Sequence, residues 1–545
     1  MPIAWVTPPI VLLILGHREG RKVLGSRAAR AAKNRGGRSR EFRNSYLYSA
    51  CAADQPADCA PLTQVAEDPR VHTPPVDTRV APLLLQAQVA IAFSFRMRSY
   101  LAFASLFLGA LCAAAGDSAH FWCHKTDDGL CENPSEDLFS QETMRELVRN
   151  VSVLPRPSSS QPVDASTIQN KVLAGYQGWD GARNEWDHWS NDGKAPNPSS
   201  KNEHFEMVPE MGEYPSDALH DTDFKYNGNG SVVKLYENAA AGVVDLHFQW
   251  MKDYGLDGVL IQRFVSEITK PGKALTQRNT ILRQMDAAAE KHGRVYAMMW
   301  DISGTADGWD TDIKNDFKNY VKNYTSSKQY LKEKGKPVVC IFGIGLHTEK
   351  ASANSSLSMI RWLQAEGLYV IGSGPYYWRT GGHDASSGFD AVHAAFDAIM
   401  PWAVGRYNNV KDFQNKIPMI EGDAKLTSSR KQDYAPIAYA GYSYRASNKI
   451  NFIKRNAGQF FKAQTDAFLK VKGASFYYIA MFDEVQEGTA IYKFAANEKE
   501  SAAGREFVTA SIDGVDCPGD LYMTMAGQYA TAAKGGPTPE PVTVK

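Results

Sequence analysis

The chain has 545 residues, and its 60 lysines and arginines balance its 60 aspartates and glutamates to a formal net charge of zero. This balance argues against nucleic acid or an anionic membrane as the main partner, because such proteins carry an excess of clustered positive charge. Aromatic residues make up 11% of the chain. Flat rings with a polar handle suit a neutral partner that is part apolar and part hydroxylated.

The N-terminal region differs in character from the rest. Residues 1–96 are basic, Ala-rich and Pro-rich, and we expect them to be disordered or to be an extension of the gene model. At Met97 the pattern of a secretory signal peptide begins, with Arg98 as the positive residue, Leu101–Leu111 as the apolar run and Ala113–Ala115 as the cleavage site. Residues 97–115 therefore predict a secreted, extracellular protein. The alternative is that the apolar run stays uncleaved as a membrane anchor.

Secretion bears on the cysteines that follow. Cys123 and Cys131 lie close together in the lead-in segment, residues 116–170, and we expect a local disulfide between them in an oxidising compartment. Cys340 lies inside an apolar run and reads as a buried free thiol. No Cys or Cys/His spacing fits a zinc site, so we expect no metal. N-glycosylation sequons begin at Asn150, Asn229, Asn323 and Asn354.

From Lys171 onward, apolar runs alternate with amphipathic segments. The runs predict strands at Val172–Tyr176, Gly258–Phe264, Val295–Trp300, Val338–Ile344, Leu368–Ile371, Ala398–Val404, Ile437–Tyr442 and Phe476–Phe482. The amphipathic segments predict helices at Ala274–His292, Asp312–Lys334, Ser355–Glu366 and Asn451–Val471. This alternation predicts an α/β fold, a (β/α)8 TIM barrel over residues 171–525, with a flexible tail at 526–545. An open doubly wound sheet is the alternative, but no Gly-rich dinucleotide fingerprint follows the first strand.

The last predicted strand releases three acids together. Asp483, Glu484 and Glu487 follow an apolar and aromatic run, just before Gly488 can turn the backbone. Carboxylates beside a buried strand must be paired, hydrogen-bonded or protonated, and neighbouring carboxylates push one pKa upward. Such a pair can supply a general acid and a base or nucleophile. The alternative is that these acids cap the next helix or bind a cation.

Barrel enzymes place their chemistry at the carboxyl ends of the strands, and polar and aromatic residues gather there in this sequence. Each aromatic ring could instead cover the core, His188 could be a satisfied loop histidine, and Arg263 or Arg406 could form a structural ion pair. Taken together, these residues predict a carbohydrate-binding surface. Its members are Tyr176, Gln177, Trp179, Asp180, His188, Trp189, Gln262, Arg263, Trp300, Asp301, Tyr377, Trp378, Arg379, Trp402, Arg406, Tyr444 and Asp483.

These residues carry a resemblance to a known family. The segment Asp483–Ile491 resembles the Asn/Asp-Glu-x-x-Glu-Gly-Thr signature near the end of the barrels in glycoside hydrolase families 71 and 99. A closer resemblance, running from about Lys171 to the segment Cys517–Tyr522, is to the secreted family 71/99-like proteins often labelled xylosidase/arabinosidase. It rests on Asp257–Phe264, Trp300–Gly304, Pro401–Tyr407 and Met481–Thr489.

The resemblance implies a (β/α)8 fold and glycosidic bond hydrolysis without a redox cofactor. Glu487 would be the general acid/base, and Glu484 would assist by deprotonating the sugar 2-hydroxyl. We therefore expect a secreted, monomeric glycoside hydrolase that acts on a neutral cell-wall polysaccharide or glycan, without stable membrane association or a nucleic-acid partner. The first alternative is a non-catalytic carbohydrate-binding protein on a glycosidase scaffold. The second is a membrane-anchored transglycosidase.

Overall fold

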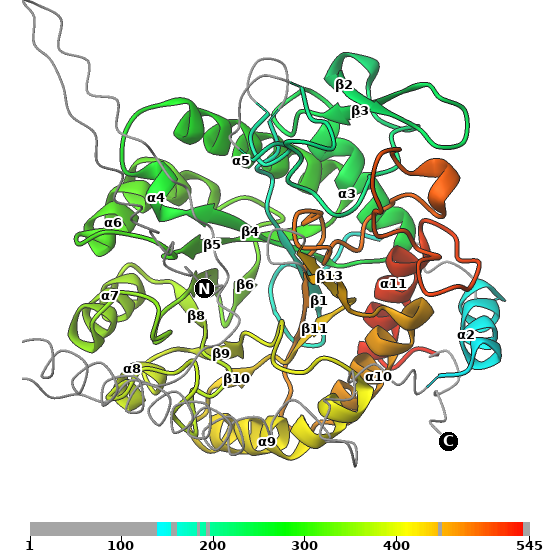
Figure 1. Ribbon diagram of the computed structural model, residues 1–545. Coiled ribbons are helices and arrows are strands. Elements are labelled where there is room, and N and C mark those ends of the chain that lie inside the picture. The colour runs from blue at the N-terminus through cyan, green and yellow to red at the C-terminus, as the bar shows by residue number, and fades with distance from the viewer. Residues whose placement is uncertain (1–138, 154–160, 182–185, 192–196, 445–448, 538–545) are drawn as a thin grey trace, which may run out of the picture. The chain divides into compact units, whose positions relative to one another are not determined.

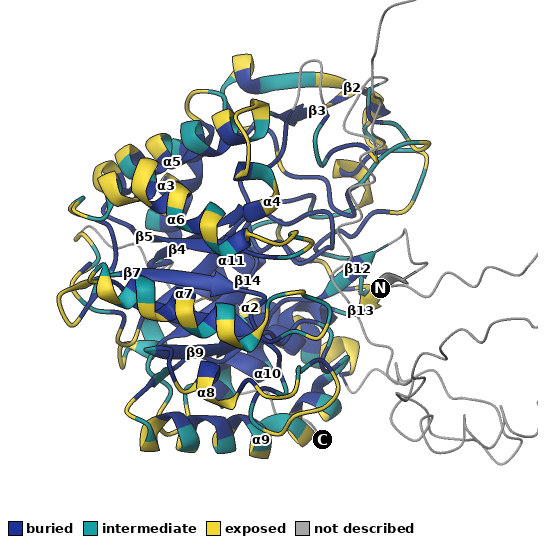
Figure 2. Ribbon diagram, turned by 90° about the vertical axis from the view of Figure 1, so that its left-hand side faces the viewer, coloured by how far each residue is buried: buried dark blue, intermediate teal, exposed yellow. Residues whose placement is uncertain are grey.

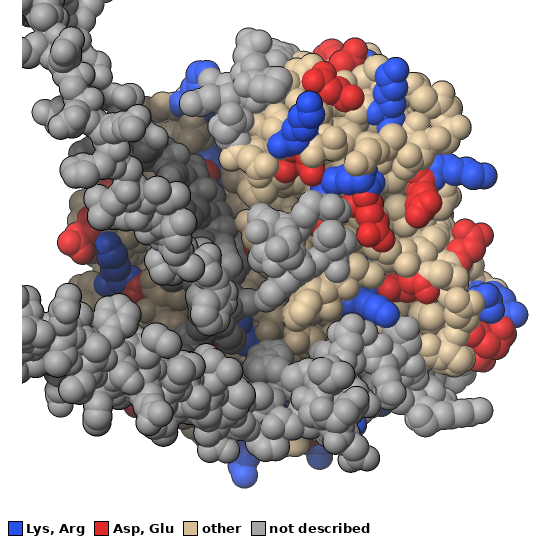
Figure 3. Space-filling model, in the orientation of Figure 1, with Lys and Arg blue, Asp and Glu red and all other residues tan. Residues whose placement is uncertain are grey.

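The computed structural model describes residues 139–153, 161–181, 186–191, 197–444 and 449–537. The extension, the signal peptide and the predicted Cys123–Cys131 disulfide lie outside these residues. No helix in the described ranges is long and apolar enough to cross a membrane. On the face seen in Figure 3, the charged side chains of both signs are interspersed, in keeping with the zero net charge.

The core of the fold is a parallel sheet in the order β10-β9-β8-β7-β5-β4-β1-β14-β11. Each neighbouring pair along this path runs parallel, and a short antiparallel strand, β6 (Lys332–Glu333), adds to β7. The strands are β1 (Val172–Tyr176), β4 (Gly258–Phe264), β5 (Val295–Asp301), β7 (Lys336–Phe342), β8 (Tyr369–Gly374), β9 (Ala398–Pro401), β10 (Asp433–Tyr434), β11 (Ile437–Tyr439) and β14 (Tyr477–Ala480).

The two ends of this order, β10 and β11, are halves of one extended segment. Only Ala435 and Pro436 separate them, and Pro436 has no N–H to donate to a neighbouring strand. The segment bonds β9 on one side, where Ala435 N–H donates to Ile399 C=O at 3.0 Å, and Ser475 just before β14 on the other, where Ser475 N–H donates to Tyr434 C=O at 2.8 Å. The sheet thus curls back on itself as an α/β barrel. With β10 and β11 joined, the described chain supplies eight barrel strands.

Helices surround these strands and turn their buried sides toward them (Figures 1 and 2). Hairpins β2–β3 (Leu219–Lys225, Val232–Tyr236) and β12–β13 (Tyr442–Tyr444, Lys449–Ile453) extend from the loops. The helices are α2 (Gln141–Val153), α3 (Val243–Tyr254), α4 (Val265–Ile268), α5 (Lys273–His292), α6 (Trp309–Asn319), α7 (Ala353–Ala365), α8 (Asp390–His393), α9 (Val410–Ser429), α10 (Gln459–Phe468) and α11 (Leu521–Ala533).

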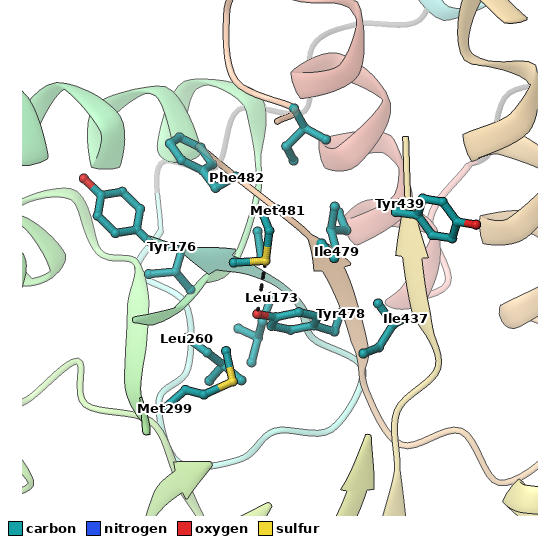
Figure 4. Packing of buried hydrophobic residues seen from close by; sticks show 14 of the residues in the cluster. Leu173, Tyr176, Leu260, Met299, Ile437, Tyr439, Tyr478, Ile479, Met481 and Phe482 are labelled. Carbon is teal, nitrogen blue, oxygen red and sulfur yellow. Dashed lines mark hydrogen bonds between the residues drawn. The ribbon is translucent and has the colours of Figure 1, made fainter. Parts of the chain in front are cut away.

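Side chains from alternate positions of the strands fill the barrel interior. Leu173, Leu260, Met299, Tyr478 and Met481 converge in Figure 4, where the Tyr478 hydroxyl lies 3.8 Å from the Met481 sulfur. Gly175 is needed in this layer, because a Cβ there would lie 2.1 Å from Met481 Cε. The interior is therefore a packed core, as is usual for barrels of this size.

Each of the eight predicted strand runs overlaps an observed strand, and the predicted helices Ala274–His292 and Ser355–Glu366 match α5 and α7 closely. Two predicted helices are too long. The segment Asp312–Lys334 ends its helix at Asn319 and later forms β6, because Lys334 and Gly335 adopt positive φ and turn the chain into a hairpin with β7. In Asn451–Val471, the first residues belong to β13 and only Gln459–Phe468 is α-helical.

A third difference concerns the C-terminus. The tail was expected to be flexible from residue 526, whereas α11 continues to Ala533. The Tyr529 ring packs at a tilt against that of Tyr477 of β14, and Gln528 Nε2 donates to Val151 C=O of α2 at 2.9 Å. The helix is therefore held in the fold by packing and a buried hydrogen bond.

Candidate active site

The three acids leave β14 on one tight turn. Both Thr489 N–H and Ala490 N–H donate to the Glu484 carbonyl, at 3.2 and 3.0 Å. These two hydrogen bonds close a turn that contains Glu487, so Glu484 and Glu487 lie on the same turn. Glu484 is only 2% exposed to solvent and Glu487 only 7%. Carboxyl groups so deeply buried pay a large desolvation cost when ionised.

Asp483 fixes the loop that follows β1. Its two carboxylate oxygens accept the backbone N–H groups of Gln177 and Gly178, at 2.8 and 2.9 Å. Burial raises the pKa of Asp483 to about 6, although these two N–H donors favour its anion. Asp483 thus positions Gln177, and its own oxygens are occupied by backbone groups.

Glu484 is held by two side-chain donors. Gln177 Nε2 donates to Oε1 at 3.0 Å and the Thr489 hydroxyl donates to Oε2 at 2.9 Å. Burial raises the pKa of Glu484 to about 7, and the charges of Asp483 and Asp301 add to the rise, while the two donors oppose it. Glu484 can therefore exchange a proton near neutral pH.

Glu487 lies in a different environment. No described residue donates a hydrogen bond to its carboxylate, whereas its backbone C=O accepts Ser443 N–H at 2.9 Å. Burial, and after it the neighbouring Glu484 charge, raises the pKa of Glu487 well above its usual range. The tyrosines of β12, Tyr442 and Tyr444, lie near enough that the Glu487 charge adds to the effect of burial in raising their pKa values. Glu487 is therefore the member of the pair that keeps its proton.

The loop after β1 also contacts the turn after β14 through hydrogen bonds to Gln486. The Trp179 indole donates to Gln486 Oε1 at 3.3 Å, and Gln486 Nε2 donates to Asp180 Oδ1 at 2.7 Å. The His188 ring stacks on Trp179 with centroids 4.0 Å apart. Burial raises the pKa of Asp180 and lowers the pKa of His188. Trp179 and Asp180 thus hold the turn after β14 through Gln486, and His188 packs behind Trp179.

Two further interior side chains lie at the ends of β4 and β5. The Gln262 amide donates to the Asp301 carboxylate, which also accepts Ser303 N–H at 2.7 Å. Asp301 is close enough to Glu484 to raise its pKa. The structure therefore brings together Gln177, Gln262, Asp301, Asp483, Glu484 and Glu487 at the carboxyl end of the strands.

Several predicted site residues point the other way, toward the helices. Tyr176 bonds His247 Nδ1 of α3 at 2.8 Å. Arg263 forms a buried ion pair with Asp316 of α6 at 2.5 Å, and the Trp300 indole donates to the same carboxylate at 2.8 Å. Side chains alternate between the two faces of a strand, so Tyr176, Arg263 and Trp300 fall on the face opposite Gln177, Gln262 and Asp301.

Other predicted residues also have structural partners. Trp189 is fully buried, and its indole donates to Tyr236 C=O at 2.9 Å. Trp189 therefore lies in the core and is not part of the proposed site. Trp402 packs edge-on against Phe342. On the loop after β8, Tyr377 accepts from Lys416, Trp378 lies under Arg430, and Arg379 pairs with Asp423. Arg406, on the loop after β9, pairs with Asp384.

Sequence reasoning missed three residues that build the site. Thr489 is the last residue of the signature and Gln486 fills one of its variable positions, but the signature assigns neither of them a role. Arg278 belongs to α5. Its guanidinium donates to the carbonyls of Gln177 and Gly178, at 2.9 and 3.0 Å. Only the folded chain reveals that contact, because about a hundred residues separate its partners.

The Asp483 contacts lead to a prediction. In D483N one carboxylate oxygen becomes an NH2 group that faces a backbone N–H, so a buried hydrogen bond is lost and two donors oppose each other. We expect a loss of about 1–3 kcal/mol in unfolding free energy, and a fall in kcat because Gln177 loses its anchor. The matched control is D257N, because Asp257 accepts Val172 N–H at 2.9 Å at the other end of β1. D257N should destabilise the protein without slowing turnover, and equal turnover in the two variants would contradict the role given to Asp483.

Within the described residues, His, Cys, Asp and Glu side chains form no cluster able to hold a metal ion. Cys340 and Cys517 are buried free thiols.

No protein-family model and no curated protein matches the sequence. Among solved structures, the chain is similar to the GH99 endo-α-mannosidase of Bacteroides thetaiotaomicron, with 13% identity, 68% of this chain and 98% of that chain covered, and a TM-score of 0.48. It is also similar to a glycoside hydrolase-like protein (16% identity, 72% and 99% covered, TM-score 0.41). The third is a GH128 endo-β-1,3-glucanase of Amycolatopsis mediterranei (14% identity, 52% and 95% covered, TM-score 0.30). At such identities and TM-scores these similarities assign no function to the chain.

Proposed function

We propose that the protein is a glycoside hydrolase in which Glu487 is the general acid and Glu484 is the base. The observation that carries this proposal is the unequal hydrogen bonding of the pair. Glu484 has two donors that favour its anion, from Gln177 and Thr489, while Glu487 has none among the described residues. The first proton lost from the pair therefore leaves Glu484, and a split pair of this kind is what glycosidic cleavage needs.

In the proposed reaction the Glu487 proton passes to the glycosidic oxygen as the bond from that oxygen to the anomeric carbon breaks. Glu484 takes a proton from the sugar 2-hydroxyl, whose oxygen attacks the anomeric carbon, as the family resemblance implies. This attack closes a three-membered ring that contains the anomeric carbon and the 2-oxygen. Water then attacks the anomeric carbon and opens that small ring, with Glu487 as the base, while Glu484 returns its proton to the 2-oxygen. Each proton is thus restored at the end of the cycle.

The charges around the pair favour an uncharged substrate. The charges of Asp483 and Asp301 already raise the pKa of Glu484, and the charge of Glu484 raises the pKa of Glu487. The nearby cation, Arg278, is engaged by Glu267 at 2.6 Å and by backbone carbonyls. An acidic sugar would add a further negative charge to this site, so a neutral polysaccharide or glycan is the proposed substrate. We also propose that the protein acts outside the cell, as the pattern at residues 97–115 predicts.

The pKa order predicts the pH dependence of the rate. We expect kcat/KM to rise as pH increases through about 7, where Glu484 loses its proton, and to fall at higher pH, where Glu487 loses its own. T489V removes one donor from the Glu484 anion, so the acidic limb should move to higher pH. The control is T167V, because Thr167 donates to Glu333 at 2.7 Å in another part of the fold. An acidic limb that stays in place or moves down in T489V would refute the assignment.

The proposal is tested by incubating the full chain with xylans, arabinans, α-glucans and α-mannans and measuring the release of reducing sugar. Xylans and arabinans come first in the panel because of the motif resemblance. We expect release from at least one neutral glycan. Tight binding of a glycan without release would favour a non-catalytic carbohydrate-binding protein instead.

A further inference from the structure

Arg455 is a buried cation that the proposed chemistry does not use. It follows the β12–β13 hairpin and is 1% exposed. Its guanidinium lies over the rings of Tyr522 and Phe494, at 4.5 and 5.1 Å from their centroids. Buried arginines usually pair with a carboxylate. No ion pair of Arg455 is found within the described residues; burial lowers the pKa of Arg455, and Tyr522 and the charge of Asp513 partly offset that effect. The direct donor contacts of the guanidinium therefore indicate its role.

The strongest contacts of Arg455 go to the turn that carries the two glutamates. Nη2 donates to the carbonyls of Gly488 and Ala490, both at 2.8 Å. Those carbonyls flank Thr489, whose hydroxyl bonds Glu484, and Gly488 directly follows Glu487. One guanidinium nitrogen therefore fixes both ends of the peptide that sets the position of the Thr489 hydroxyl.

The backbone beside Arg455 is also unusual. Asn456 and Ala457, both non-glycine residues, adopt positive φ values of 48°. Two such residues in succession are costly, and they persist only where the surroundings hold them. Asp513 supplies part of that hold, because its carboxylate accepts the backbone N–H groups of both residues. The strained pair turns the chain between β13 and α10 at the point where Arg455 enters the core.

We propose that Arg455 is a positioning residue for the acid/base pair: it holds the turn from Gly488 to Ala490 so that Thr489 bonds Glu484 and Glu487 faces the substrate. The role rests on the proposed function. It is a matter of geometry, because the guanidinium donates to carbonyls of the turn and touches neither carboxylate.

The test compares R455M with R294M. Arg294 is a matched control, since its buried guanidinium also donates to backbone carbonyls, those of Gly293 at 2.8 Å, Leu256 at 3.2 Å and Gln161 at 3.0 Å, at the start of β5. Both variants should lower the midpoint of thermal unfolding. Only R455M should lower kcat/KM by about 100-fold and move the acidic limb of its pH profile upward, because the Thr489 hydroxyl no longer supports the Glu484 anion.

A milder variant keeps the test decisive if R455M does not fold. R455K retains a donor but cannot reach both carbonyls as a fork does, so we expect an intermediate loss of about 10-fold and a limb shift in the same direction. A readout without turnover is the 13C NMR titration of the Glu484 carboxyl, assigned by its absence in E484Q. Its pKa should rise in the Arg455 variants and stay unchanged in R294M.

The outcomes separate the two proposals. If the wild-type protein cleaves no glycan, the proposed function fails, while the NMR titration still decides whether Arg455 controls Glu484. If the wild-type protein is active but the Arg455 variants match R294M in kcat/KM, pH profile and titration, the positioning role is overturned and Arg455 only stabilises the fold.

Discussion

E487Q should lose about 10²- to 10⁴-fold in kcat on a natural glycan, because the glutamine amide has the shape of the acid but no proton to give the leaving oxygen. The loss should depend on the leaving group. An aryl glycoside whose phenol is a good leaving group needs little protonation, so E487Q should cleave it at a rate much closer to that of the wild-type protein. E484Q should be slow on both substrates, because it removes the base rather than the acid.

The matched control for these variants is E333Q. Glu333 is also buried, and it accepts the Thr167 hydroxyl at 2.7 Å and Ile168 N–H at 2.8 Å, but it lies on β6, away from the turn. E333Q should be less stable than the wild-type protein and turn over at a similar rate. If E333Q loses as much activity as E487Q, the loss reflects damage to the fold.

R263M should reduce the unfolding free energy by about 3–5 kcal/mol, the usual cost of removing one partner of a buried ion pair. Arg263 bonds Asp316 through two nitrogens, at 2.5 and 2.8 Å, and Asn279 at 2.7 Å. The substitution leaves the Asp316 carboxylate buried without its cation. Chemical denaturation measures the loss, and kcat below the unfolding midpoint should stay within a few-fold of the wild-type value.

A surface pair provides the comparison. Lys234 and Asp221 form an ion pair at 2.5 Å with side chains that are 49% and 63% exposed, so K234M should cost about 0–1 kcal/mol. If R263M abolishes turnover while leaving stability near that of K234M, Arg263 contacts substrate, and the structural role inferred from its contacts is wrong.

The strands were predictable because each is a short apolar run bounded by polar residues, and β4 was placed at Gly258–Phe264 as observed. The predicted site was less selective, since it took whole strand ends as one surface. Strand parity alone would have separated Gln262 from Arg263 and Asp301 from Trp300, because adjacent side chains point to opposite faces.

Other parts of the site could not be read from the sequence. The contact of Gln486 with Asp180 joins residues 306 positions apart and that of Arg455 with Gly488 joins residues 33 positions apart, and neither pair has a distinctive spacing. The order of the two glutamates depends on which one receives the donors of Gln177 and Thr489. Those contacts depend on how the loop after β1 meets the turn after β14.

The most direct test of the central claim is the rate of E487Q on a poor and a good leaving group attached to the same sugar, beside the wild-type protein and E484Q. The account predicts that E487Q is slow on the poor leaving group and recovers most of its rate on the good one, while E484Q recovers on neither. If E487Q is equally impaired on both substrates and E484Q is the variant that recovers, the roles of the two glutamates are reversed and the proposed mechanism is contradicted.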